Sequence, residues 1–233
     1  KAIDGKTVRV VKRWSEEDER SGKLYEYDVP METKALIHEY GESDFPSTNH
    51  REVFFDIETE ILQGFPDWRD PVNKITAIAW YERSIDKYGV FVLDEKDRVK
   101  SVSKDNCEVV ICKTEGELLY KFLEKYVELD PTILTGWNIE GFDVPYLYNR
   151  IKTVLGDDYA NSLSPIGKVN YREHLDRYYI EGVSCLDYLP LYRKYTIGER
   201  SSYRLDAIGQ TEVGLGKIEY DGDLNELFAT DIH

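Results

Sequence analysis

The chain has 233 residues, with 45 acidic and 30 basic side chains and a formal net charge of −15 at pH 7. A hydrophobic fraction of 41% excludes a wholly disordered chain, and the short apolar runs exclude a membrane span. Three cysteines without a CxxC pair indicate a reducing compartment and no zinc site, while the strong acidity argues against nucleic-acid binding unless bound cations reverse the field.

The first fifty residues are highly charged and contain two short strand candidates, residues 7–11 and 23–29, and a helix candidate over 32–40. Residues 41–50 are rich in Gly, Ser, Asp and Pro, a composition typical of linkers. We therefore predict that residues 1–45 are the end of an N-terminal domain. Residues 46–233 form the second domain of this prediction.

Strands and helices then alternate along the second domain. Three β-rich runs with short turns between them predict an antiparallel meander, and a fourth run follows: 52–58, 73–81, 88–94 and 107–112. Thr114 and Glu117 form a capping box that opens an amphipathic helix, which Asp130-Pro131 ends.

The remaining elements complete an α/β fold with a mixed sheet. A short strand over 132–136 and a helix over 142–155 predict parallel pairing of that strand with 52–58. A hairpin over 168–183, with its tip at 174–176, and two further helices follow, over 186–195 and 203–213.

The strand run Phe54-Phe55-Asp56-Ile57-Glu58 carries the first candidate site. Side chains alternate along a strand, so Asp56 and Glu58 share one face, with Cα atoms roughly 7 Å apart. Two such carboxylates can converge on a hard divalent cation. The alternative is the solvated face of an edge strand, although the hydrophobic opposite face favours a central strand.

Asp143 is the second candidate. It begins a helix two residues before Pro145, so an ordinary N-cap is the alternative interpretation. Its cluster nevertheless follows the C-terminal end of a predicted parallel strand, the edge at which open α/β sheets bind ligands. Pairing of that strand with 52–58 brings Asp143 near Asp56 and Glu58.

FDIET followed by TGWNIEGFDVPYLYNRI resembles the first and second exonuclease motifs of family B DNA polymerases, especially those of tailed phages and related viruses. GVSCLDYLPLYR, YRLDAI and GKIEYDG follow in the family's order, so the resemblance covers roughly residues 32–230. It implies a ribonuclease H-like mixed sheet flanked by helices. It also implies a DNA-directed DNA polymerase whose 3′→5′ proofreading exonuclease uses two Mg²⁺ or Mn²⁺ ions.

The resemblance also assigns roles to individual residues. Asp56, Glu58 and Asp143 match the catalytic metal ligands of the two motifs. Five further residues are expected to contact DNA: Asn138 near the primer terminus, Phe142 and Phe65 on bases, Arg172 on a hairpin like the family's exonuclease hairpin, and Lys217 on phosphate. The alternatives are an ordinary turn residue for Asn138, core packing for Phe142, turn anchoring for Phe65, an ordinary exposed hairpin for Arg172 and an ordinary surface position for Lys217.

One motif of the family is missing. No Tyr-x-x-x-Asp follows Asp143; this spacing occurs only earlier, at Tyr40–Asp44 and Tyr126–Asp130, and Asp231 lacks the matching Tyr. We therefore interpret the chain as a truncated N-terminal fragment with at most weak activity of its own. A catalytically inert ribonuclease H-like scaffold and a stand-alone ribonuclease H-like nuclease remain the alternatives.

The resemblance implies as partners the single-stranded 3′ end of DNA, the polymerase domains missing from this chain and a sliding clamp, with no membrane. If the source is viral, the location is the cytoplasm of a bacterial host. The charge distribution is compatible with this, because Thr48–Asp143 has a net charge of −8 whereas Tyr148–Arg204 has +2. The second segment is the predicted DNA-facing surface.

Overall fold

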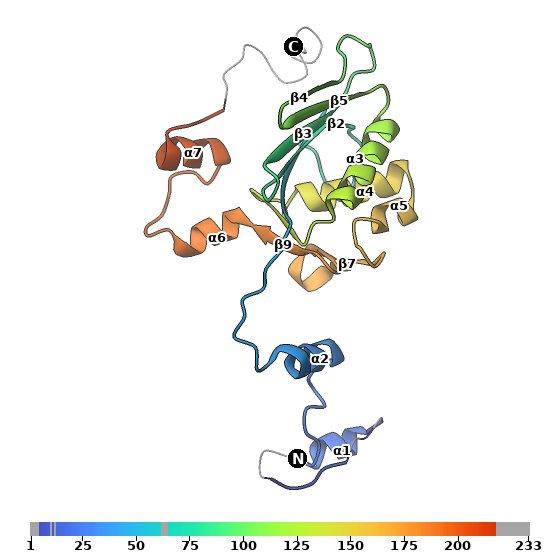
Figure 1. Ribbon diagram of the computed structural model, residues 1–233, viewed down its shortest axis with the longest axis vertical. Coiled ribbons are helices and arrows are strands. Elements are labelled where there is room, and N and C mark those ends of the chain that lie inside the picture. The colour runs from blue at the N-terminus through green and yellow to red at the C-terminus, as the bar shows by residue number, and fades with distance from the viewer. Residues whose placement is uncertain (1–4, 10, 12, 62–64, 218–233) are drawn as a thin grey trace. The chain divides into compact units, whose positions relative to one another are not determined.

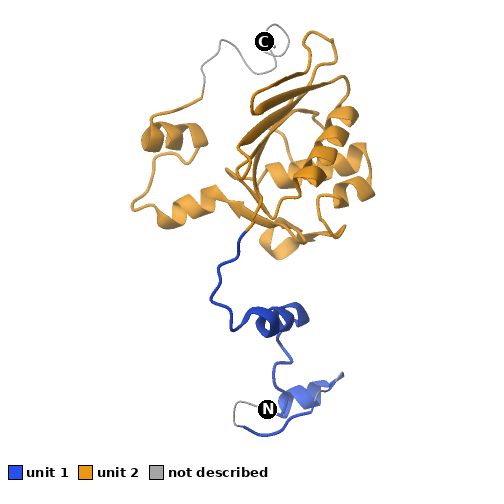
Figure 2. Ribbon diagram, in the orientation of Figure 1, with its two compact units in different colours: residues 1–48 blue, residues 49–233 orange. Residues whose placement is uncertain are grey.

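The computed structural model describes residues 5–9, 11, 13–61 and 65–217. It divides the chain into two compact units, residues 1–48 and residues 49–233 (Figure 2). Each unit is described by itself below. Asp231, considered above as a metal ligand, and the end of the GKIEYDG segment lie outside the described residues.

The first unit contains two helices, α1 (Glu16–Arg20) and α2 (Met31–Tyr40), and the second of these confirms the predicted helix. The strands predicted at 7–11 and 23–29 are wrong, because the described residues of both ranges form no strand. A strand needs a neighbour to pair with its N–H and C=O groups, and the described residues of this unit supply none. None of these described side chains is buried.

The second unit is built on a seven-stranded mixed sheet, in the order β4-β5-β3-β2-β1-β6-β9. The antiparallel pairs β1–β2 and β2–β3 confirm the predicted meander, and β6 pairs parallel with β1, also as predicted. The strands are β1 (Glu52–Thr59), β2 (Ile75–Glu82), β3 (Lys87–Leu93), β4 (Val102–Lys104), β5 (Cys107–Cys112), β6 (Ile133–Gly136) and β9 (Ser184–Asp187).

Two strands were not predicted. β4 is three residues long and exposed throughout, so it lacks the alternating pattern that marks a strand. β9 replaces the start of the helix predicted over 186–195, because residues 184–187 pair parallel with β6. The helix itself, α6 (Tyr188–Tyr195), begins only after Asp187, whose side chain caps it by accepting from the N–H of Leu189.

Three helices pack on one face of the sheet: α3 (Glu115–Leu129), α4 (Asp143–Val154) and α5 (Asp157–Asn161) (Figure 1). Thr114 caps α3 through the N–H of Glu117, as predicted, but the Glu117 carboxylate accepts from Lys113 rather than from Thr114. The apolar side of β1 faces this layer, with Val53, Phe55 and Ile57 buried in the core.

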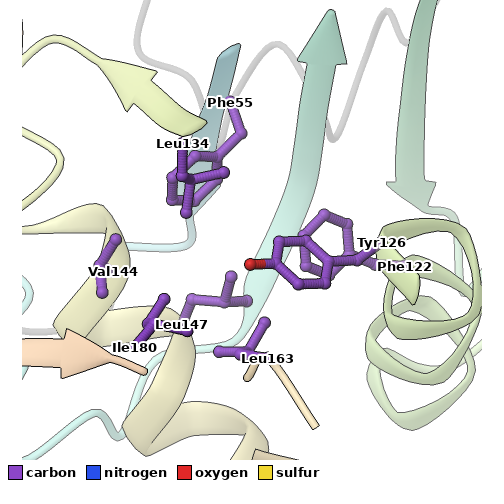
Figure 3. Close-up of a pocket in the computed structure, with 8 residues that line it drawn as sticks. All are labelled: Phe55, Phe122, Tyr126, Leu134, Val144, Leu147, Leu163 and Ile180. Atoms are coloured by element: carbon purple, nitrogen blue, oxygen red, sulfur yellow. The ribbon is translucent and has the colours of Figure 1, made fainter. Parts of the chain in front are cut away.

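The core between the sheet and these helices encloses a cavity of about 10 Å³ (Figure 3). Its lining is apolar except for the hydroxyl of Tyr126, which has no hydrogen-bond partner among the described residues. This volume is at the lower limit for a single water molecule, so the cavity is a packing defect and no ligand site. Eight side chains line it: Phe55, Phe122, Tyr126, Leu134, Val144, Leu147, Leu163 and Ile180.

A hairpin and a last helix complete the unit. β7 (Val169–Arg172) and β8 (Arg177–Ile180) pair antiparallel through a 3₁₀ turn at Glu173–Leu175, which confirms the predicted hairpin and its tip. α7 (Leu205–Val213) begins two residues after the predicted start of its helix. No helix in the described ranges is long and apolar enough for a membrane span.

Candidate active site

β1 presents Asp56 and Glu58 on the sheet face opposite the buried Phe55 and Ile57. The strand lies between β2 and β6, so it is not an edge strand, although its Asp56 and Glu58 side chains are exposed. Desolvation raises the pKa of Asp56. Desolvation, followed by the charge of Asp56, raises the pKa of Glu58, and the nearby Lys217 ammonium opposes both shifts.

Asp143 reaches the same strand from α4. Its carboxylate is buried, and its Oδ1 atom accepts from the backbone N–H of Ile57 at 3.1 Å. That N–H is available because β6 pairs with β1 only as far as Phe54. The side chain therefore does not cap α4: Phe142 occupies the N-cap position, without a side-chain hydrogen bond.

The environment of Asp143 disfavours its ionised form. Burial raises the pKa of Asp143 to about 8, and the negative charge of Asp56 is the second cause. The hydrogen bond from Ile57 opposes this shift, because it stabilises the carboxylate. Asp143 and Asp56 are thus electrostatically coupled across β1 and α4.

Of the three carboxylates, the two on β1 suit a divalent cation that is held partly by substrate. Within the described ranges, no group of three or more His, Cys, Asp or Glu side chains is close enough to hold a metal ion. Mg²⁺ in phosphoryl-transfer sites is commonly bound by one or two carboxylates together with substrate phosphates. The pair Asp56 and Glu58 fits that donor set, and the repulsion between the two is the kind that a cation relieves.

The loop of residues 137–142, here called the Asn138 loop, connects β6 to α4. Its backbone is held by Asp187, whose carboxylate accepts from the N–H groups of Asn138 at 2.9 Å and Glu140 at 3.1 Å. Asn138 has a φ of 63° and an exposed side chain. A Cβ atom at Gly141 would lie 2.6 Å from the Asn138 Oδ1 atom, so a larger residue there would displace the Asn138 side chain.

Asp187 had no role in the sequence analysis. Its position before an apolar helix is a signal for an N-cap, and the structure confirms that use. The hydrogen bonds to the Asn138 loop could not be read from the sequence, because they depend on the parallel pairing of β9 with β6.

The other candidate residues lie in different surroundings. Phe142 is half-buried, with its ring centroid 5.3 Å from that of Tyr146, so it packs at the edge of the core. Phe65 is 94% exposed in the connection from β1 to β2. Arg172 stacks on the ring of Tyr179 at 4.0 Å. In the described part of the chain, no hydrogen bond or ion pair joins Phe65 or Arg172 to the three carboxylates.

Lys217 is the last described residue, and its charge reaches the candidate site. It lowers the pKa values of both Asp56 and Glu58, which places its ammonium group near these carboxylates. Its backbone N–H donates to Asp206 of α7 at 2.7 Å. Lys217 is therefore the candidate DNA-contacting residue that the structure brings to the acidic pair.

An apolar groove of about 590 Å³ runs beside Asp56 over the open face of the sheet. Tyr81 and Tyr88 stack on its floor with ring centroids 4.3 Å apart. The far wall comes from α7, which contributes Leu205, Ile208 and Val213. Asp56 thus lies at an accessible face, unlike the apolar cavity on the helical side.

A family model described as the exonuclease domain of DNA polymerase family B matches residues 2–208. The chain belongs to this family. The DNA-directed DNA polymerase of Escherichia phage RB69 is 34% identical over 80% of this chain and 24% of its own length. That of Enterobacteria phage T4 is 35% identical over 71% of this chain and 22% of its own length.

The similarity extends to cellular enzymes. The DNA polymerase delta catalytic subunit of Plasmodium falciparum is 34% identical over 43% of this chain and 9% of its own length. The chain spans about a quarter of the two phage polymerases that it matches. Its mixed sheet flanked by helices is the ribonuclease H-like fold expected of the family, whose exonuclease domains are in general metal-dependent nucleases.

Proposed function

We propose that this chain is the proofreading exonuclease region of a DNA-directed DNA polymerase and hydrolyses the 3′-terminal phosphodiester of single-stranded DNA. One observation carries the proposal: Asp143 hydrogen-bonds to the Ile57 N–H, between the two residues of β1 that present carboxylates to the open face. Two ligands from a strand and one from the neighbouring helix are thereby brought to one stretch of backbone.

In this proposal Asp56 and Glu58 would hold a cation that in turn binds the scissile phosphate, and Asp143 would act on the second cation from α4, directly or through water. Two Mg²⁺ or Mn²⁺ ions, when bound, would supply charge neutralisation and an activated water for in-line displacement. The chain's own contribution is to fix the carboxylates, since β1 is central and α4 is packed on the core.

The proposed DNA contacts follow the exposed side chains around the carboxylates. The effect of the Lys217 charge on the pKa of Asp56 supports a contact of this lysine with a substrate phosphate, and the exposed Asn138 lies on the loop that leads into Asp143. Phe65 has an almost fully exposed ring on which an unpaired base can stack. Arg172 would contact the strand from the hairpin, whereas the packing of Phe142 against Tyr146 favours its core role.

The setting of this region in a longer polymerase is part of the proposal. The partners proposed are the remaining polymerase domains, a sliding clamp and DNA, within the cytoplasm of a bacterial host if the source is a phage. We also propose that residues 1–45 belong to an N-terminal domain and residues 46–233 to the exonuclease domain. The identity to two phage polymerases supports this setting.

A catalytically inert scaffold is the second candidate function. The observation in its favour is that the described ranges contain no cluster of three or more acidic, histidine or cysteine side chains able to hold a metal ion. On this reading the carboxylates of β1 serve only to solvate the open face of the sheet.

The paired substitution Asp56→Ala with Glu58→Ala distinguishes the exonuclease from the inert scaffold. We expect the 233-residue chain to release nucleoside monophosphates from 3′-labelled single-stranded DNA slowly in Mn²⁺, and the double variant to release none. Mn²⁺ affinity, measured by electron paramagnetic resonance, should fall at least about tenfold. Asp157→Ala with Asp158→Ala, which removes the same charge from the exposed surface of α5, is the matched control. Equal digestion and equal Mn²⁺ binding by both double variants would contradict the proposal.

A further inference from the structure

The tip of the β7–β8 hairpin carries two adjacent residues of opposite charge that pair with two different loops. Asp176 accepts from the Arg69 guanidinium at 2.5 Å, whereas Arg177 donates to the Glu140 carboxylate at 2.7 Å. Arg69 lies in the connection from β1 to β2, and Glu140 lies in the Asn138 loop between β6 and α4. A single turn of chain thus bridges two loops that are far apart in sequence.

Both loops are continuous with the candidate active site. The segment of residues 65–72, here called the Trp68 loop, belongs to the connection that follows β1, the strand of Asp56 and Glu58. The Asn138 loop leads directly into Asp143 at the start of α4. The hairpin tip is therefore joined to a segment downstream of two of the carboxylates and to a segment just upstream of the third.

Aromatic packing holds the Arg69 side chain in the position from which it pairs with Asp176. The centroid of the Trp68 ring lies 6.0 Å from the ring centroids of both Tyr171 and Tyr178 of the hairpin. The Arg69 guanidinium stacks on Trp68, with its Cζ atom 4.1 Å from the ring centroid. The Tyr171 hydroxyl donates to the second carboxylate oxygen of Asp176 at 2.5 Å. Asp176 is therefore held between a residue of its own hairpin and a residue of the Trp68 loop.

Asn149 of α4 ties the same two segments to the core. Its side-chain amide donates to the backbone carbonyl of Trp68 at 2.8 Å, and its oxygen accepts from the Tyr178 hydroxyl at 2.9 Å. The Trp68 loop and the hairpin thus share an anchor on the helix that begins with Asp143.

The second ion pair acts on the Asn138 loop, whose backbone is already held by Asp187. Asp187 holds the backbone of the Asn138 loop, while Arg177 holds the Glu140 side chain, which is 15% exposed. The Asn138 side chain between these attachments remains exposed. Glu140 is therefore held twice, through its backbone by Asp187 and through its side chain by Arg177.

The exposure of these pairs argues that their effect is on geometry rather than on stability. The Arg69 and Asp176 side chains are 55% and 53% exposed, and that of Arg177 is 43% exposed. Ion pairs so open to solvent add little to folding stability, since water screens them. They can still select the arrangement in which the two loops, each held to the core at other points, meet the hairpin tip.

We propose that Asp176 and Arg177 are positioning residues, which clamp the Trp68 loop and the Asn138 loop to the hairpin tip and so set the width of the entrance through which a DNA 3′ end reaches the carboxylates. This inference rests on the proposed function for its substrate. The clamp itself is a property of the DNA-free chain, and any displacement of the hairpin is transmitted to both loops at once.

Charge reversal tests the clamp without DNA. In Arg177→Glu, hydrogen–deuterium exchange of the Asn138 and Glu140 amides should rise several-fold, because the loop loses the ion pair that joins Glu140 to the hairpin. The double variant Arg177→Glu with Glu140→Arg should restore exchange to within about twofold of wild type. Asp176→Arg should likewise raise amide exchange in the Trp68 loop, and its combination with Arg69→Asp should restore it. The midpoint of thermal unfolding should shift by less than about 3 °C.

Digestion of single-stranded DNA gives the second readout. Arg177→Glu should raise KM several-fold with little change in kcat, and Arg177→Lys should keep most of the wild-type KM. Lys152→Glu, which breaks an exposed ion pair of 2.8 Å with Asp157, is the control and should alter neither exchange in the two loops nor KM.

The outcomes separate this inference from the proposed function. Unchanged exchange in both single reversals, or a loss that the charge-swapped double variants do not restore, would overturn the clamp. If exchange responds as expected but the wild-type chain and Arg177→Glu digest no DNA, the clamp stands and the proposed function fails.

Discussion

Asp143 differs from the other two carboxylates because the fold buries it. Its carboxylate accepts from the N–H of Ile57 and from its own backbone N–H, and these hydrogen bonds do not offset the loss of hydration together with the charge of Asp56. In the metal-free protein, Asp143 therefore holds its proton in a pH range where an ordinary carboxyl group has lost it.

This shift predicts that the metal-free protein loses stability as the pH rises. The pKa of Asp143 is raised from 3.8 to about 8, so between these values the folded state retains a proton that the unfolded state releases. The free energy of unfolding should fall with rising pH over this window, by up to about 1.4 kcal/mol per pH unit. Asp143→Asn, which imitates the neutral form, should remove this contribution and be more stable than wild type at pH 8.

Urea unfolding in EDTA at pH 5, 6, 7 and 8 measures the effect. The informative quantity is the difference between the wild-type and Asp143→Asn slopes, because every other titrating group is common to both proteins. Parallel slopes would show that Asp143 is ionised in the folded state throughout this range.

The sequence predicts some parts of this site and not others, for reasons visible at single residues. Strand alternation is local, so Asp56 and Glu58 could be placed on one face in advance. The hydrogen bond between Asp143 and Ile57 depends on where β6 stops pairing with β1, and the support from Asp187 depends on β9. Such contacts join residues that no short-range pattern relates.

At the scale of elements, local patterns again predict some features, whereas features that depend on distant partners are missed. The meander, the capped helix α3 and the parallel partner of β1 follow from apolar periodicity and from the handedness of crossovers, and all three are confirmed. β9 was missed because its four residues run directly into α6, so the helical signal of LDYLPLYR masks it. Short strands added at a sheet edge are specified by their neighbours more than by their own residues.

A buried ion pair joins three of these elements. Glu115, the first residue of α3, accepts from the Arg150 guanidinium of α4 at 2.6 Å and from the backbone N–H of Ile75 in β2 at 2.9 Å. Arg150 also donates to the carbonyl of Pro71 at 2.8 Å. The side chains of Glu115 and Arg150 are only 8% and 11% exposed, so each depends on the other for its compensation.

We expect Glu115→Ala to destabilise the protein by about 3–5 kcal/mol, because it leaves the buried Arg150 charge without its counter-charge and the buried Ile75 N–H without its acceptor. Glu117→Ala, two residues further along the same helix, removes a half-exposed carboxylate and should cost about 1 kcal/mol or less. Urea unfolding of the two variants at one pH compares them directly. Similar losses in both would mean that the buried network contributes no more than a surface pair.

At the scale of the whole molecule, the strong acidity is compatible with the proposed DNA binding because the excess of acidic side chains lies in only part of the chain. The net charge of −8 between Thr48 and Asp143 includes the three carboxylates of the candidate site, where bound cations would reverse the local field. The net charge of +2 between Tyr148 and Arg204 includes the hairpin and its arginines. The total of −15 therefore does not describe the surface that the proposed substrate would meet.

The distribution of buried side chains predicts how the chain tolerates truncation. The described residues of 1–48 bury no side chain, whereas those of the second unit form an extensive apolar core. Folding stability comes mainly from buried apolar area, so a chain that begins at Asn49 should unfold within about 3 °C of the full chain. A chain that begins at Glu60 lacks β1, which is central in the sheet, and should not fold. Thermal unfolding followed by circular dichroism compares the three chains; a loss of more than about 5 °C on removing 1–48 would show that these residues stabilise the sheet unit.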